Sequence, residues 1–139
     1  MTIWKKNLTL EQLNQAGQHC AVAHLGIEIS ERGEDYLKAV MPVDQRTTQP
    51  QGFLHGGISA ALAETVGSLA GFCCVETQQA VVGVEINASH LRPVRSGYVT
   101  ATAKPVRLGT TLQVWQIDIH DQHDKLCCVA RLTLSVVNL

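Results

Sequence analysis

The chain has 139 residues, enough for one domain with its own hydrophobic core, so we expect a single domain over residues 1–139. A net charge of −1 and a sequence pI of about 6.6 argue against a general nucleic-acid binder and against a protein held on an anionic membrane surface. No apolar segment typical of a signal peptide follows the first residues, Met-Thr-Ile-Trp-Lys-Lys, so we expect a cytoplasmic protein.

The first predicted element is a short helix that begins after Thr9. Gln12, three residues on, completes a capping box, and Gly17 follows the last apolar residues of the helix. Residues 24–30 and 35–43 then have the composition of two strands on either side of a turn-prone segment. The N-terminal part of the chain is therefore predicted to supply one helix and two strands.

The longest predicted helix lies within residues 55–75, where Glu64 is the only charged residue after the helix start. At 100° per residue, the apolar side chains fall on one face suited to pack on a sheet: Ile58, Leu62, Val66, Leu69 and Cys73. Small residues surround Glu64 on the opposite face: Gly57, Ala60, Ala61, Ser68 and Gly71. Another backbone or a ligand can approach such a surface, so the pattern favours a pocket wall.

Three other interpretations of Glu64 exist. A buried acid satisfied by hydrogen bonds is one, but buried acids are rare unless they are paired. A solvent-facing residue is the second, although a solvated helix face usually carries several charges. A membrane span is the third, and the central Glu64, the many small residues and the absence of a basic flank argue against it.

The start of this helix has a composition suited to binding. A polar connection between Pro42 and Pro50 leads to His55-Gly56-Gly57, and two glycines let a ligand approach the backbone closely. The first amides of a helix are free and lie at the positive end of its dipole. Such an end can polarise a carbonyl group or hold an oxyanion.

Four strand-like segments follow, at Ala80–Leu91 and at about 98–107, 111–121 and 125–137. In the first of them, Val82, Val84, Ile86 and Ala88 alternate with the residues between them. The short connections predict an antiparallel meander. With the two earlier strands, the chain is predicted to form an α+β fold, an antiparallel sheet of about six strands wrapped around a long central helix.

The five cysteines are Cys20 and two adjacent pairs, Cys73-Cys74 and Cys127-Cys128. An odd number of cysteines in a chain without a signal peptide indicates reduced thiols, and no C-x-x-C spacing suggests a metal site. We expect most of them to pack as small apolar side chains, and we expect no metal and no cofactor.

Several of these segments together resemble the hotdog-fold acyl-CoA thioesterases. Within that family, the resemblance is greatest to the branch that contains both the thioesterases for 1,4-dihydroxy-2-naphthoyl-CoA of menaquinone biosynthesis and the proofreading thioesterases of enterobactin biosynthesis. It spans nearly the whole chain. The residues that carry it are Met41-Pro42-Val43-Asp44, Arg46-Thr47, Gln49-Pro50, Gly52, Leu54-His55-Gly56-Gly57, Ala63-Glu64, Gly67-Ser68, Val81-Val82-Gly83 and Glu85-Ile86-Asn87-Ala88.

The resemblance implies a role for each catalytic position. Glu64 would be the catalytic carboxylate, as nucleophile or as general base. The Gly56 N–H would polarise the thioester carbonyl, His55 and Gln49 would position the thioester, and Ser68 would lie near Glu64 and the attacking water. Structural roles are the alternatives: His55 could only cap the helix, and Ser68 could only be a small packing residue.

The resemblance also places His90 and Arg92 at the coenzyme A entrance, where the charge and fork of Arg92 suit a phosphate. Both could instead be ordinary polar residues at a strand end. Three functions remain open on the sequence: an acyl-CoA thioesterase, a proofreading hydrolase of misacylated aryl carrier protein, and a non-catalytic acyl-CoA-binding module.

Gly56 and Glu64 are eight residues apart on one helix, about 12 Å along its axis, so one thioester carbon cannot reach both. We therefore expect a homodimer in which the helix start of one subunit meets Glu64 of the other. The resemblance further implies that two dimers pair into a homotetramer.

Overall fold

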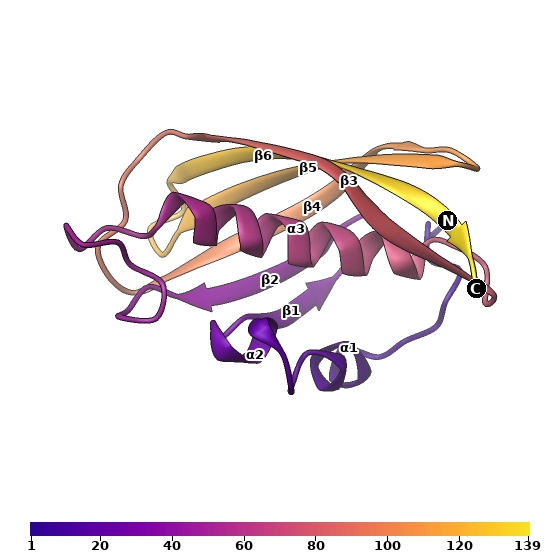
Figure 1. The fold of residues 1–139 in the computed structure, drawn as a ribbon, viewed down its shortest axis with the longest axis horizontal. Helices are drawn as coiled ribbons and strands as arrows, with labels where there is room; N and C mark the ends of the chain where they lie inside the picture. The colour runs from indigo at the N-terminus through magenta and orange to yellow at the C-terminus, as the bar shows by residue number, and fades with distance from the viewer.

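An antiparallel sheet of six strands curves around one long helix, α3 (Gly56–Cys73), in the computed structural model, which describes residues 1–139 (Figure 1). Two short helices, α1 (Leu10–Ala16) and α2 (Ala21–His24), lie beside the first strand. The strands are β1 (Glu28–Arg32), β2 (Leu37–Pro42), β3 (Gln79–His90), β4 (Tyr98–Leu108), β5 (Leu112–Asp121) and β6 (Leu126–Asn138). The predicted α+β fold, with about six strands around a central helix, is confirmed.

The strand order is β1-β2-β4-β5-β6-β3, and every neighbouring pair is antiparallel. Strands β4, β5 and β6 form the predicted meander. The prediction was wrong for β3, which pairs with β6 and not with β4, so the connection over residues 91–97 crosses from one part of the sheet to another. Because of this crossing, β3 becomes an edge strand that lies alongside α3 (Figure 1).

Helix α3 packs on the concave side of the sheet through a stripe of small and apolar residues. Its buried residues are Ser59, Leu62, Ala63, Val66, Gly67, Ala70, Gly71 and Cys73, whereas the predicted core residues Ile58 and Leu69 are only half-buried. Gly71, which we expected beside Glu64, faces the sheet, where an added Cβ would clash with the Leu134 side chain. No helix of the chain, α3 included, is long and apolar enough to cross a membrane.

The N-terminal helix α1 is held against the sheet at β1. Thr9 and Gln12 form the predicted capping box. The Asn14 side chain accepts a hydrogen bond from Ile29 N at 2.7 Å and donates one to Ile29 O at 3.0 Å. The strand predicted at 24–30 begins only at Glu28, because residues 21–24 form α2 and Gly26 turns the chain with a φ of +76°.

A β-bulge interrupts β3 and changes which side chains face α3. The register to β6 shifts between Gly83 and Glu85, so Val84 has no partner in the ladder. The predicted unbroken alternation was therefore wrong: Val82 and Val84 are 50% and 59% exposed, whereas Ile86 packs against the core. Each half of β3 alternates correctly, but the two halves are out of phase.

None of the five cysteines is bridged, and four are buried, as the sequence predicted for most of them. Burial raises the pKa of the Cys74 thiol to about 12 and that of Cys127 to about 11. Cys20 alone is exposed.

Candidate active site

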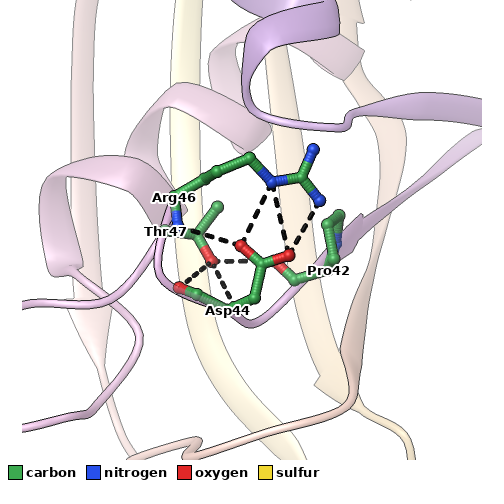
Figure 2. Close-up of polar contacts among 4 residues, drawn as sticks. All are labelled: Pro42, Asp44, Arg46 and Thr47. Carbon is green, nitrogen blue, oxygen red and sulfur yellow. Dashed lines mark hydrogen bonds and ion pairs between the residues drawn. The ribbon is translucent and has the colours of Figure 1, made fainter.

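The loop between β2 and α3 is organised by a tight polar turn (Figure 2). The buried Thr47 hydroxyl donates to Pro42 O at 2.8 Å and accepts from Asp44 N at 3.0 Å. The Asp44 carboxylate accepts from Arg46 N at 2.9 Å and from the Arg46 guanidinium at 2.7 Å. The hydrogen bonds from Arg46 hold the pKa of Asp44 below its ordinary value of 3.8.

This turn fixes the two polar residues that precede the helix. Thr47 O accepts a hydrogen bond from His55 N at 2.8 Å, and Gln49 N donates to Phe53 O at 2.8 Å. The Gln49 side-chain oxygen accepts from Gln51 N at 2.5 Å and from Phe53 N at 3.4 Å. The amide Nε2 of Gln49 has no partner in the chain and is available to a ligand.

The start of α3 leaves a backbone donor free. His55 caps the helix, with its Nδ1 accepting from Gly57 N at 2.9 Å, whereas no hydrogen bond in the chain uses the Gly56 N–H. The His90 imidazole lies against Gly56, and an added Cβ there would be 2.8 Å from His90 Nε2. A side chain at residue 56 would push the imidazole away from the helix start.

Four of the predicted residues line one cavity of about 340 Å³, which we call the helix-start cavity: Gln49, Gly56, His90 and Arg92. Its other walls include Phe53, Leu91 and Pro93. Arg92 forms no ion pair with a carboxylate, and the Arg95 guanidinium lies 4.1 Å from the centroid of the Phe53 ring. The cavity therefore combines the unpartnered Gln49 amide and Gly56 N–H with one cation that forms no ion pair, Arg92.

Glu64 and Ser68 line a different cavity of about 400 Å³, which we call the Glu64 cavity. Its walls come from α1, α2, β1 and α3, and they are mostly apolar: Leu13, Asn14, Ala16, Gly17, Cys20, Val22, Ile29, Ala61, Thr65 and Leu69 complete the lining. A carboxylate on the rim of an apolar cavity is a candidate catalytic group.

The sequence predicted Glu64 in a pocket wall; in the single chain Glu64 does line a cavity, but the residue is exposed and not buried. Its side chain has neither a hydrogen bond nor an ion pair, although β3 passes beside it at Gly83. The residue thus carries an unpaired negative charge at the cavity rim.

The structure divides the predicted residues between two cavities, with His55 capping the helix start and lining neither. Sequence analysis missed the contributions of α1 and α2 to the Glu64 cavity and of Arg95 and Phe53 beside the helix-start cavity. Nothing local in the sequence indicates that α1 and α3 line the same cavity. No group of three or more His, Cys, Asp or Glu side chains lies close enough to hold a metal ion.

A sheet curved around one helix, with a free amide at the helix start and an acid eight residues on, defines a class of hotdog-fold thioester hydrolases. The family model of the Thioesterase superfamily matches residues 51–128, and the chain belongs to this family. The match covers the helix-start residues, Glu64 and the strand that ends at His90.

Solved and characterised relatives cover almost the full length of the chain. A crystal structure of a thioesterase from Haemophilus influenzae has 64% sequence identity and a TM-score of 0.98, covering 99% of this chain and 96% of that one. A 1,4-dihydroxy-2-naphthoyl-CoA hydrolase of Escherichia coli is 51% identical over 135 residues, which are 97% of this chain and 99% of that protein. A proofreading thioesterase of Cronobacter turicensis is 50% identical over 135 residues, 97% and 98% of the two chains.

Proposed function

We propose that this thioesterase hydrolyses an acyl-CoA with an aromatic or medium-length acyl group to the free acid and the thiol. Glu64 acts as the nucleophile or as the general base that activates water. The Gly56 N–H, at the positive end of α3, stabilises the oxyanion that forms on the thioester carbonyl, and Gln49 Nε2 donates beside it. His55 holds the helix start in place, and Ser68 lies on the side of the attacking water.

The two cavities suit the two halves of such a substrate. The guanidinium of Arg92, with His90 in the same cavity and Arg95 over its Phe53 wall, suits the phosphates of coenzyme A. The apolar Glu64 cavity, at about 400 Å³, lies in the size range of small-ligand sites and suits an acyl group. The chain is similar to a 1,4-dihydroxy-2-naphthoyl-CoA hydrolase of Escherichia coli. The first substrate to test is therefore 1,4-dihydroxy-2-naphthoyl-CoA, a compound of menaquinone biosynthesis.

The observation that carries this proposal is the separation of the oxyanion donor from the acid. Gly56 and Glu64 line different cavities of one chain and are about 12 Å apart along α3. A thioester carbon must lie near both groups at once. We therefore propose a homodimer with two shared sites, each combining the helix start of one protomer with Glu64 of its partner.

Edge strand β3 offers the surface for this dimer. Its 12 residues pair with β6 on one side only, and its exposed Val82 and Val84 are unusual for a solvated edge. Glu64 lies against Gly83, and Gly56 lies against His90. Two antiparallel β3 strands related by a two-fold axis between these positions bring Glu64 of one copy level with Gly56 of the other.

A dimer formed through β3 can assemble further. The hotdog resemblance implies that two dimers join into a homotetramer, and we retain this arrangement as part of the proposal. Light scattering of the purified chain measures the mass directly: a monomer at micromolar concentration contradicts the shared site, whereas a dimer or a tetramer agrees with it.

The direct test measures release of the acid and free coenzyme A by chromatography from 1,4-dihydroxy-2-naphthoyl-CoA, benzoyl-CoA, a medium-chain acyl-CoA and an aryl-loaded carrier protein. Chromatography is preferable to a thiol reagent, because the exposed Cys20 would itself react. We expect turnover of at least one acyl-CoA. Binding without release would identify a non-catalytic acyl-CoA-binding module instead.

A carrier-protein substrate is the second candidate, supported by the identity of 50% to a proofreading thioesterase. A higher kcat/KM on aryl-loaded carrier protein than on any acyl-CoA would establish this alternative. The same Glu64 and Gly56 chemistry serves both substrates, since only the thiol portion differs.

Mixing of inactive subunits tests the shared site. E64A and Q49A protomers are refolded or co-expressed together at equal concentrations. We expect about a quarter of the wild-type rate, because half of the dimers are mixed and each mixed dimer holds one intact site of two. Each variant alone serves as control, and a mixture no faster than the two variants alone contradicts a site formed between protomers.

A further inference from the structure

Gly83 on β3 lies directly against the carboxylate of Glu64. A Cβ added at Gly83 would be 2.7 Å from Glu64 Oε2 and 3.9 Å from its Cδ, and no other atom comes within 4 Å. The distance of 2.7 Å is shorter than real Cβ atoms show. The space that a side chain would fill at residue 83 is thus occupied by the carboxylate alone.

Neither backbone conformation nor core packing explains a glycine at this position. The positive-φ glycines of the chain are Gly26, Gly52 and Gly97, so Gly83 has a backbone that any residue adopts. It is also exposed, unlike Gly67 and Gly71, whose missing side chains let α3 approach the sheet. Glycine weakens the interior of a strand, so its presence here calls for a close approach by another group.

The bulge at Val84 determines what else faces Glu64. Gly83 pairs with the buried Leu134, so it lies on the face of β3 that looks toward α3. In a regular strand, Glu85 would share that face and bring a second carboxylate beside Glu64. The bulge turns Glu85 to the other face, where Asn87 Nδ2 donates to its carboxylate at 3.2 Å.

From these contacts we propose that Gly83 is a positioning residue for Glu64: its missing side chain, presented by the bulge, leaves the space from which the carboxylate reaches the bound acyl group. The inference rests on the proposed catalytic role of Glu64. A methyl group at residue 83 displaces the carboxylate without touching the helix-start cavity, and small displacements of a catalytic group are costly.

The test is a double-mutant cycle with G83A and E64D. In the wild-type background, we expect G83A to lower kcat about 30- to 100-fold, with KM for the acyl-CoA within about twofold. Aspartate is one methylene shorter and withdraws from Gly83. In the E64D background, the same G83A change should therefore cost less than about threefold. Equal costs in both backgrounds would overturn the inference, because damage to strand or dimer does not depend on residue 64.

Two controls accompany the cycle. S89A makes a similarly small change on the opposite face of β3 and should leave kcat unchanged, and light scattering should give one mass for all variants. The ¹³C resonance of the Glu64 carboxyl, assigned by its loss in E64Q, should move in G83A and not in S89A. If wild-type protein hydrolyses no thioester, the proposed function fails, and this resonance alone decides the inference: an unchanged position overturns it.

Discussion

The helix-start cavity and the Glu64 cavity both lie against α3, yet they are built in different ways. The first carries the polar side chains of Gln49, His90 and Arg92, and most of its residues come from the loop before α3, the start of α3 and the segment that begins at the end of β3. The second is mostly apolar, and its walls come from helices α1 and α2 and strand β1, far away in the sequence. In the proposed reaction, the start of α3 and the end of β3 bind the part that every acyl-CoA shares, and the N-terminal helices shape the site for the variable acyl group.

The largest effect is expected from the loss of the Glu64 carboxylate. E64A should lower kcat at least about 1000-fold, because general-base or nucleophilic chemistry is lost. The melting temperature should change by less than about 2 °C, because the side chain is exposed and forms no ion pair. Steady-state kinetics and calorimetry measure the two quantities, and near-normal hydrolysis by E64A removes the assignment.

The second prediction tests whether the helix-start cavity binds the nucleotide part of coenzyme A. R92A should raise KM for an acyl-CoA about tenfold, as expected for lost charge-assisted hydrogen bonds, with little change in kcat. The same acyl group on pantetheine, which lacks the nucleotide, should show no change. R107A, at an exposed position near the far end of β4, is the matched control. An equal effect of R92A on both substrates contradicts a role in nucleotide binding.

A smaller effect follows from Cys20, which is exposed and lines the Glu64 cavity. Burial raises the pKa values of Cys73, Cys74, Cys127 and Cys128, so alkylation at neutral pH should modify Cys20 first. A non-hydrolysable acyl-CoA at about five times its Kd should slow this alkylation about sixfold. Coenzyme A without an acyl group should protect far less, and equal protection by both would place the acyl group elsewhere.

The smallest effect concerns the turn that supports the helix-start cavity. Hydrogen bonds from Arg46 lower the pKa of Asp44 from its ordinary value of 3.8. The ionised carboxylate therefore stabilises the folded state at any pH above 3.8. That contribution is lost as the pH falls through the lower, folded-state pKa. D44N should therefore lower the melting temperature slightly at pH 7, and the difference should shrink below pH 3.8. A difference independent of pH in thermal scans contradicts this origin.

The sequence was sufficient where interactions are local. Thr9 and Gln12 predicted the capping box, and the run from His55 to Val75 predicted α3, because caps and helical periodicity depend on neighbouring residues. The placement of Glu64 and Ser68 away from the helix start followed from the rise of the helix alone.

Features set by long-range pairing were not predictable in the same way. The pairing of β3 with β6, in place of the predicted hairpin with β4, depends on contacts about 50 residues apart, to which turn signals do not respond. The bulge at Val84 shifts the alternation by one residue, so the two halves of β3 gave a false common pattern. The α1 wall of the Glu64 cavity depends on Asn14 reaching Ile29, a tertiary contact without local signature.

The two hydrogen bonds between the Asn14 side chain and the Ile29 backbone bear on whether the chain can polymerise through its sheet edges. Both backbone groups of Ile29 that would otherwise be open at the outer edge of β1 are satisfied by one side chain, and β1 is short and carries its own register shift. The sheet therefore has one open edge strand, β3, and one edge strand, β1, that the Asn14 side chain partly blocks. In the proposed dimer the two β3 edges pair with each other, so only the two β1 edges remain, and the Asn14 side chain on Ile29 disfavours further strand addition there.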